Sequence, residues 1–131
     1  MAHYLDTSAL VKLVVVEDET DALQQWLVKS PRNPVACDLA RTELLRAVRR
    51  AAPDRALRAR QVLDSLILTE VTPSLFEQAG RLDPRDLRTL DAIHLSAALD
   101  LGDDLDGMVS YDARLSHAAR QAGVTVFSPH E

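Results

Sequence analysis

Short apolar runs alternate with longer stretches of helical periodicity along the whole chain, and this alternation restricts the possible fold more than any other feature. The runs that have the length and composition of strands are Ala2–Leu5, Val35–Cys37, Ile67–Val71, Met108–Tyr111 and Thr125–Phe127. Strand–helix alternation indicates an α/β fold with a largely parallel sheet that is buried on both faces. A length of 131 residues suits one domain, which we expect to span residues 1–131.

Capping residues and prolines delimit the helices expected between these runs. The expected helical segments are Thr7–Val16, Asp18–Lys29, Asp38–Ala51, Pro53–Leu66, Pro73–Pro84, Thr89–Leu101 and Asp112–Ala122. Asp38 and Thr89 are expected at N-cap positions, and Pro73 suits the first turn of a helix. The three valines at positions 14–16 disfavour the end of the first helix, because β-branched side chains lose χ1 freedom there.

The cysteine content and the hydropathy pattern set the expected environment. Cys37 is the only cysteine, which excludes a disulfide framework and favours a reducing, cytoplasmic setting with a small buried thiol. No stretch has the roughly 18 consecutive apolar residues of a membrane span. Met1–Leu13 also lacks the basic start and the uninterrupted apolar centre of a signal peptide. We therefore expect a cytoplasmic protein with no membrane contact.

Three carboxylates stand where predicted strands end or predicted helices begin. Asp6 follows the first strand, Asp112 follows the fourth, and Asp91 lies in the first turn of its helix. In open parallel sheets, ligands bind beyond the carboxyl ends of the strands, which places Asp6 and Asp112 at the functional edge. Each acid taken singly also has an explanation as a helix cap, since the helix dipole stabilises an anion at the N-terminus.

Glu43 is harder to explain as a cap, because it lies in the second turn of its helix beside Leu44 and Leu45. It either reaches water past the apolar stripe or points inward toward the other acids. Gathering several carboxylates is unfavourable because like charges raise one another's pKa, and a hard divalent cation compensates for this. Mg²⁺ and Mn²⁺ prefer oxygen ligands, and such a metal supports phosphodiester hydrolysis by activating water.

Four segments in a fixed order carry a family resemblance. They are DTSALVK from Asp6, TELL from Thr42, LRTLDAIHLSAA from Leu87 and SYDARL from Ser110. Together they resemble the PIN-domain nucleases and, within these, the VapC toxins of toxin–antitoxin pairs. The resemblance extends from Tyr4 to about Val126. It implies a PIN-like α/β fold with a five-stranded parallel sheet of order 3-2-1-4-5 between helices.

The four acids of the family fall on Asp6, Glu43, Asp91 and Asp112. The resemblance implies that Asp6 and Asp91 are the principal metal ligands, and that Glu43 and Asp112 complete the cluster through water or a second metal. Ser8 matches a hydroxyl that holds metal-bound water or a carboxylate, and it also suits a helix-start cap. The implied activity is that of a Mg²⁺- or Mn²⁺-dependent endoribonuclease acting on cellular RNA. The implied partners are a cognate antitoxin, a second copy in a homodimer, and promoter DNA reached only through the antitoxin.

A basic segment stands out in a chain whose net charge is −5. Residues 41–60 include seven arginines and two acids. Arg46 follows Glu43 by three residues and so shares its helical face. Arg46, with Arg49 and Arg50, is expected to contact RNA phosphates or antitoxin carboxylates, since phosphate contacts supply most of the affinity for nucleic acid. The alternative is a solvated helix face.

Other charged or polar groups near the acids are given structural interpretations. Arg88 and Arg114 flank Asp91 and Asp112, and a structural ion pair is the alternative to a phosphate or antitoxin contact for them. His94 lies three residues after Asp91 among apolar neighbours. We interpret it as a packed or hydrogen-bonded histidine rather than a metal ligand.

Two other functions remain open. In an α/β phosphotransfer protein, Asp6 would be a covalent phospho-acceptor, although the haloacid-dehalogenase pattern has a second Asp where this chain has Ser8. In a non-catalytic module, the same fold would bind RNA or an antitoxin without cleaving anything. The four intact acids count against that module, because a site released from catalysis has no reason to keep so unfavourable a cluster.

Overall fold

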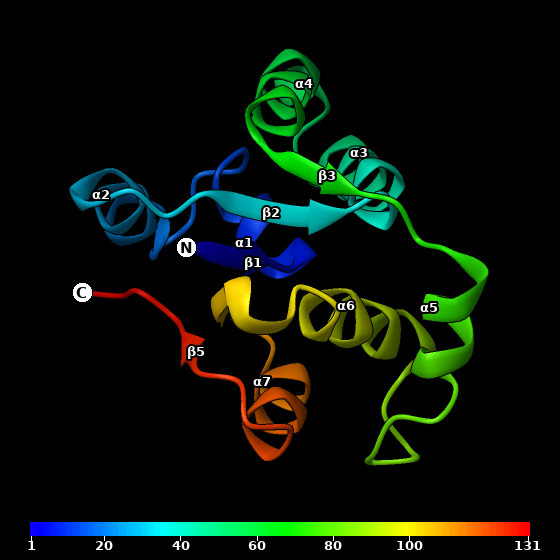
Figure 1. Ribbon diagram of the computed structural model, residues 1–131. Helices are drawn as coiled ribbons and strands as arrows, with labels where there is room; N and C mark the ends of the chain where they lie inside the picture. Colours follow the sequence, from blue (N-terminus) through cyan, green and yellow to red (C-terminus); the bar gives the residue numbers. More distant parts are fainter.

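A five-stranded, all-parallel sheet forms the centre of the computed structural model, which describes residues 1–131 (Figure 1). The strands are β1 (Ala2–Leu5), β2 (Pro34–Cys37), β3 (Ile67–Thr69), β4 (Leu105–Val109) and β5 (Val126–Phe127). Their order is β3-β2-β1-β4-β5. The predicted fold class and strand order are therefore confirmed.

Helices cover both faces of this sheet. They are α1 (Thr7–Lys12), α2 (Thr20–Lys29), α3 (Leu39–Ala51), α4 (Ala56–Ser65), α5 (Pro73–Ala79), α6 (Thr89–Leu99) and α7 (Ala113–Gln121), with short 3₁₀ turns at Pro53–Arg55 and Gly102–Asp104. One buried cluster joins the sheet to α1–α4, and a second joins it to α5–α7. None of the helices is long and apolar enough to cross a membrane.

Alternating side chains of the central strands supply the two core layers. Tyr4 and Met108 pack with the cluster that includes α5–α7, whereas Leu5 and Val109 pack with the cluster that includes α1–α4. All four are fully buried. This follows from the period of two in a strand, and burial on both faces is typical of a parallel sheet covered by helices.

Some predicted boundaries were wrong. The first helix ends at Lys12 rather than Val16, and the Thr20 hydroxyl donates to the Lys12 carbonyl oxygen at 2.7 Å. The fourth strand starts earlier than predicted, at Leu105, where pairing with β1 extends it through polar residues. The helix that starts at Pro73 ends at Ala79, well before Pro84, and Gly80 is its C-cap.

The predicted caps have a mixed outcome. Asp38 is the N-cap residue of α3, as predicted, although its side chain accepts from Arg41 Nε at 2.9 Å and not from the helix backbone. Thr89 is not a cap, because it is the first helical residue of α6. Pro73 does occupy the first turn of α5, as predicted. The cap there is the preceding Thr72, whose Oγ1 accepts from the backbone N of Leu75 at 3.2 Å.

Gly107 brings β4 and β5 into close contact, which gives a test of the sheet packing. A Cβ at this position would lie 2.5 Å from Phe127 Cε2 and 2.9 Å from the carbonyl oxygen of Thr125. We expect Gly107→Ala to lower the free energy of unfolding by about 1–3 kcal/mol, because the ring and backbone of β5 must move. Urea denaturation followed by circular dichroism measures this. Phe127→Leu in the same background should restore part of the loss, and an unchanged free energy for Gly107→Ala would contradict the packing.

Candidate active site

Three of the predicted acids lie at the edge of the sheet where β1 and β4 end. In Figure 1 the arrow of β2 points toward this edge, and β1 runs parallel to it. Asp6 directly follows β1 and is the N-cap of α1. Asp112 is the N-cap of α7, which follows β4, and Asp91 lies in the first turn of α6. The fold thus brings together side chains that are far apart in the sequence.

Asp6 is held rigidly inside this edge, with only 3% of its surface exposed. Ser8 Oγ donates to its Oδ1 and Ser110 Oγ donates to its Oδ2, both at 2.6 Å, and the Ala9 backbone N donates to Oδ1 at 3.0 Å. Burial raises the pKa of Asp6, while these three hydrogen bonds partly oppose the rise. Oδ1 already accepts two hydrogen bonds, whereas Oδ2 accepts only one and keeps a further lone pair available for a cation.

The two serines also connect Asp6 to the loop that carries Asp112. Ser8 Oγ accepts from the backbone N of Tyr111 at 2.9 Å, and Ser110 Oγ accepts from the backbone N of Asp112 at 3.1 Å. Ser8 therefore positions the carboxylate of Asp6, and the cap of α1 is Asp6 itself. The sequence analysis missed Ser110. The sequence feature that could have indicated Ser110 is a small hydroxyl residue between an apolar strand and Asp112.

Asp91 and Asp112 line the same depression in the surface. This hollow, which we call the acid hollow, has a volume of about 270 Å³ and is lined by Arg88, Asp91, Asp112, Ala113 and Arg114. Burial raises the pKa of Asp91, and repulsion from Asp112 raises it further. Asp112 Oδ1 also accepts from a backbone N in the first turn of α7, as an N-cap does.

The charges of all the other predicted acids affect the pKa of Asp91. Asp6 and Glu43 add to the repulsion from Asp112, and only His94 acts in the opposite direction. No group of three or more acidic, histidine or cysteine side chains is arranged in this structure to surround a single ion. Asp6, Asp91 and Asp112 share one edge and Glu43 adds to the same electrostatic field, but the four acids do not form a closed ligand cage.

Glu43 faces His94 instead of standing free. Its Oε1 accepts from Thr7 Oγ1 at 2.8 Å and from His94 Nε2 at 2.5 Å. Burial on its own raises the pKa of Glu43, but the hydrogen bond and charge of His94 and the hydrogen bond from Thr7 bring it below the usual value. Glu43 is therefore an ionised carboxylate with a fixed orientation.

His94 is the centre of a buried polar network that the sequence analysis did not assemble. Its Nδ1 lies 2.7 Å from Tyr4 Oη, which also accepts from the backbone N of Cys37 at 3.3 Å. Burial lowers the pKa of His94, but the Cys37 contact and the hydrogen bond and charge of Glu43 raise it to about 10. The interpretation of His94 as a packed, hydrogen-bonded residue is confirmed, as is the burial of Cys37.

The arginines of residues 41–60 fall into three groups. Arg41 and Arg60 pair with nearby acids, while Arg55 Nε and Arg58 Nε donate to the carbonyl oxygens of Val14 and Leu13. The remaining three, Arg46, Arg49 and Arg50, are exposed on α3 and form no ion pair. Arg88 and Arg114 likewise form no ion pair, so the structural alternative for them is wrong.

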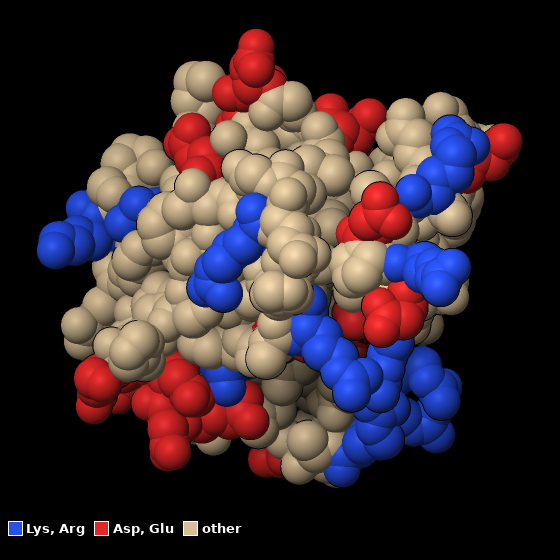
Figure 2. Space-filling view, turned by 90° about the horizontal axis from the view of Figure 1, so that it is seen from below, with Lys and Arg blue, Asp and Glu red and all other residues tan.

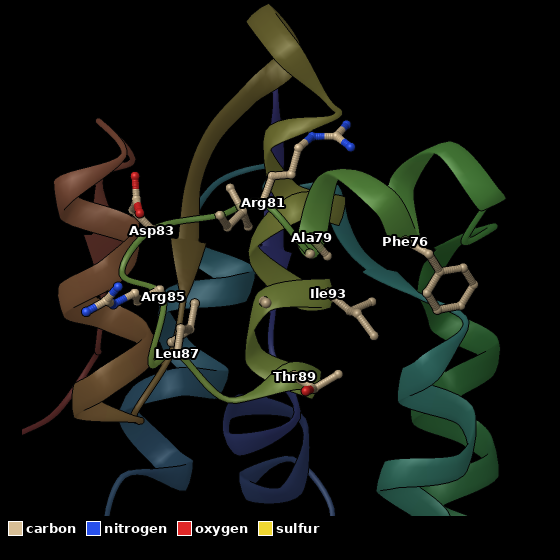
Figure 3. Close-up of a pocket in the computed structure, with 11 residues that line it drawn as sticks. Phe76, Ala79, Arg81, Asp83, Arg85, Leu87, Thr89 and Ile93 are labelled. Atoms are coloured by element: carbon tan, nitrogen blue, oxygen red, sulfur yellow. The ribbon is translucent and has the colours of Figure 1, made fainter.

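A separate cavity of about 330 Å³ lies between α5, α6 and the segment that joins them (Figure 3). Its lining combines apolar side chains such as Phe76 and Ile93 with the charged Arg81, Asp83 and Arg85. None of the four predicted acids lines it. The cavity is thus distinct from the acid hollow.

Comparison with known proteins gives the family. Residues 3–121 match the family model described as the PIN domain. The chain is 43% identical to Ribonuclease VapC46 of Mycobacterium tuberculosis over 129 residues, which cover 98% of both chains. It is 39% identical to Ribonuclease VapC47 of the same species, with 96% of both chains covered. The chain therefore belongs to the PIN domain family, in its VapC ribonuclease branch.

Solved structures share the fold. The Mycobacterium tuberculosis VapC20 structure, described as a sarcin-ricin loop cleaving toxin, superposes with a TM-score of 0.76 at 18% identity, covering 97% of this chain and 99% of that one. A toxin–antitoxin complex from Klebsiella pneumoniae gives a TM-score of 0.74 at 19% identity, with 98% of each chain covered.

Proposed function

We propose that the protein is a Mg²⁺- or Mn²⁺-dependent endoribonuclease and the toxin of a toxin–antitoxin pair. The observation that carries the proposal is the convergence of Asp6, Asp91 and Asp112 at one edge, where burial, together with repulsion from the other acids, raises the pKa of Asp91. A bound cation would compensate for this repulsion. Relatives at 39–43% identity that are named ribonucleases support the activity.

The donor chemistry of the acids fits a hard divalent cation. All four side chains offer carboxylate oxygens, which Mg²⁺ and Mn²⁺ prefer. Asp6 and Asp91 would be the principal ligands, with Asp112 and Glu43 in support. When bound, the metal supplies an activated water and neutralises charge on the phosphate.

The chain's own residues would keep these acids ready for that role. Ser8 and Ser110 hold both oxygens of Asp6 in place. Thr7 and His94 hold Oε1 of Glu43 in its ionised form. Because these orientations are fixed in advance, little reorganisation is needed when an RNA phosphodiester arrives.

The proposed partners follow from the family and the charge distribution. A cognate antitoxin is supported by the structural likeness to a toxin–antitoxin complex. Arg46, Arg49 and Arg50, which have no ion pairs, would contact RNA phosphates or antitoxin carboxylates. We further propose a homodimer that reaches promoter DNA only through the antitoxin.

Metal binding can be tested apart from activity. Saturating Mg²⁺ should raise the melting temperature of the wild type, since a ligand at 100 times its Kd stabilises by about 2.7 kcal/mol. Asp91→Asn should show no such rise, and Asp103→Asn, at an exposed acid in the Gly102–Asp104 turn, should behave like the wild type. EDTA should abolish cleavage of structured RNA. Cleavage that persists in EDTA would contradict the metal dependence, and RNA binding without cleavage under any condition would favour the non-catalytic module.

A further inference from the structure

Arg88 and Arg114 stand at the starts of the two helices that carry Asp91 and Asp112. Arg88 is the N-cap residue of α6, and Arg114 is the second residue of α7. Both side chains are exposed, and neither forms an ion pair. Two arginines that form no ion pair thus lie beside Asp91 and Asp112, whose carboxylates make this region negative.

Both arginines are shared by two neighbouring hollows. The first is the acid hollow of about 270 Å³. The second, which we call the outer hollow, has a volume of about 320 Å³ and is lined by Pro84, Asp86, Leu87, Arg88, Arg114 and His117. The two arginines therefore lie on the boundary between the hollows, and we call this pair the arginine saddle.

The arginine saddle lines the acid hollow itself, whereas no arginine of α3 does. Each residue along a helix advances by about 1.5 Å, so Arg46 lies roughly 4.5 Å and Arg50 roughly 10 Å beyond Glu43 along α3. The saddle residues instead belong to the first turns of helices that start at the acid edge. In Figure 2, which views the molecule from below, Lys and Arg side chains gather most densely at the lower right, toward the edge to which the strands point in Figure 1.

We propose that the arginine saddle binds the backbone phosphate of RNA next to the one that is cleaved. The inference rests on the proposed ribonuclease function and names the substrate contact of that site. The cleaved phosphodiester would lie in the acid hollow, and the neighbouring nucleotide would enter the outer hollow. The guanidinium groups suit phosphate because their planar fork donates two parallel hydrogen bonds. Asp86 and His117 would face the sugar or base, since the carboxylate of Asp86 itself repels phosphate.

RNA binding without metal tests the saddle apart from catalysis. The dissociation constant of a short single-stranded RNA should be measured in EDTA by fluorescence anisotropy for the wild type, Arg88→Ala and Arg114→Ala. Each substitution should weaken binding about tenfold, the effect of one charge-assisted hydrogen bond. Each should also reduce the slope of log K against log salt by about 0.7, the value for one phosphate contact on a single strand. Arg120→Ala, at an exposed arginine in the last turn of α7, is the matched control and should change neither quantity.

Cleavage kinetics and antitoxin binding complete the test. In Mg²⁺, the saddle variants should raise KM about tenfold and keep kcat within about twofold, because the contact is made to a phosphate that does not react. Saddle variants that bind RNA like Arg120→Ala would overturn the inference. Unchanged RNA affinity with weakened antitoxin binding would assign the saddle to the antitoxin instead. If the wild type cleaves no RNA, the proposed function fails, while the affinities in EDTA still report on the saddle.

Discussion

Asp6→Asn should reduce RNA cleavage by at least about a hundredfold without weakening the fold, because a charged group at the reaction centre is lost. The substitution keeps the shape of the side chain, and the hydroxyls of Ser8 and Ser110 can rotate to match an amide. Burial raises the folded-state pKa of Asp6 above its ordinary value of 3.8. The folded state therefore holds this proton more tightly than the unfolded chain. The free energy of unfolding thus falls as the pH rises from the unfolded-state pKa of Asp6 through its folded-state pKa.

The consequence at neutral pH is a variant that is inactive but at least as stable as the wild type. The penalty for a buried charge at Asp6 grows as the pH rises, and asparagine removes it. Comparing kcat/KM on structured RNA with the melting temperature at pH 7 tests both parts. Asp104→Asn, at an acid in the Gly102–Asp104 turn, should leave cleavage unchanged. Wild-type cleavage by Asp6→Asn would exclude Asp6 from the site, and a clearly lower melting temperature would contradict the linkage argument.

His94→Leu should lower the free energy of unfolding at pH 7 by about 3 kcal/mol, because it leaves the carboxylate of Glu43 without its buried partner. The side chain of His94 is 3% exposed and that of Glu43 is 21% exposed, so little water is available to replace the lost contact. Tyr4 Oη also loses its neighbour at 2.7 Å. Urea denaturation of both proteins gives the difference.

The effect of His94→Leu should depend on pH in a defined direction. The pKa of His94 rises from 6.5 to about 10 in the folded protein, so its contribution is fully present below pH 6.5 and is lost as the pH rises toward 10. The difference between wild type and His94→Leu should therefore be larger at pH 6 than at pH 9. A double-mutant cycle with Glu43→Gln isolates the pair, and a coupling energy near zero would contradict the ion pair.

The sequence predicts the parts of the site that local patterns determine. Asp6 and Asp112 were placed correctly as acids near strand ends, since an apolar run followed by an acid is a local signal. Ser110 was not predicted as a partner of Asp6, and Tyr4 was not predicted as a partner of His94. These contacts join residues that are 104 and 90 positions apart. The first contact follows from the register of β1 with β4, and the second follows from the packing of α6 against the sheet. Periodicity alone specifies neither of them.

The roles of the arginines show the same division. Seven arginines within residues 41–60 looked like one basic face, but Arg55 and Arg58 donate to the carbonyl oxygens of Val14 and Leu13. Those carbonyls are available because α1 ends at Lys12, a boundary that the sequence placed too late. The misplaced end of α1 therefore hid the partners of Arg55 and Arg58, whereas Arg46, Arg49 and Arg50, which were the arginines predicted to contact a partner, form no ion pair.

The pairing of β1 with β4 also determines when the site can form during synthesis. β1 and Asp6 are made before the neighbouring strand β4 and the hydroxyl of Ser110, which come more than a hundred residues later. Contacts this distant in sequence slow folding, because a long loop must close before they form. A growing chain that stops short of Ser110 lacks both the second serine of Asp6 and the acid of α7. The nascent protein would thus be harmless to RNA in the cell that makes it until Ser110 and Asp112 have been synthesised.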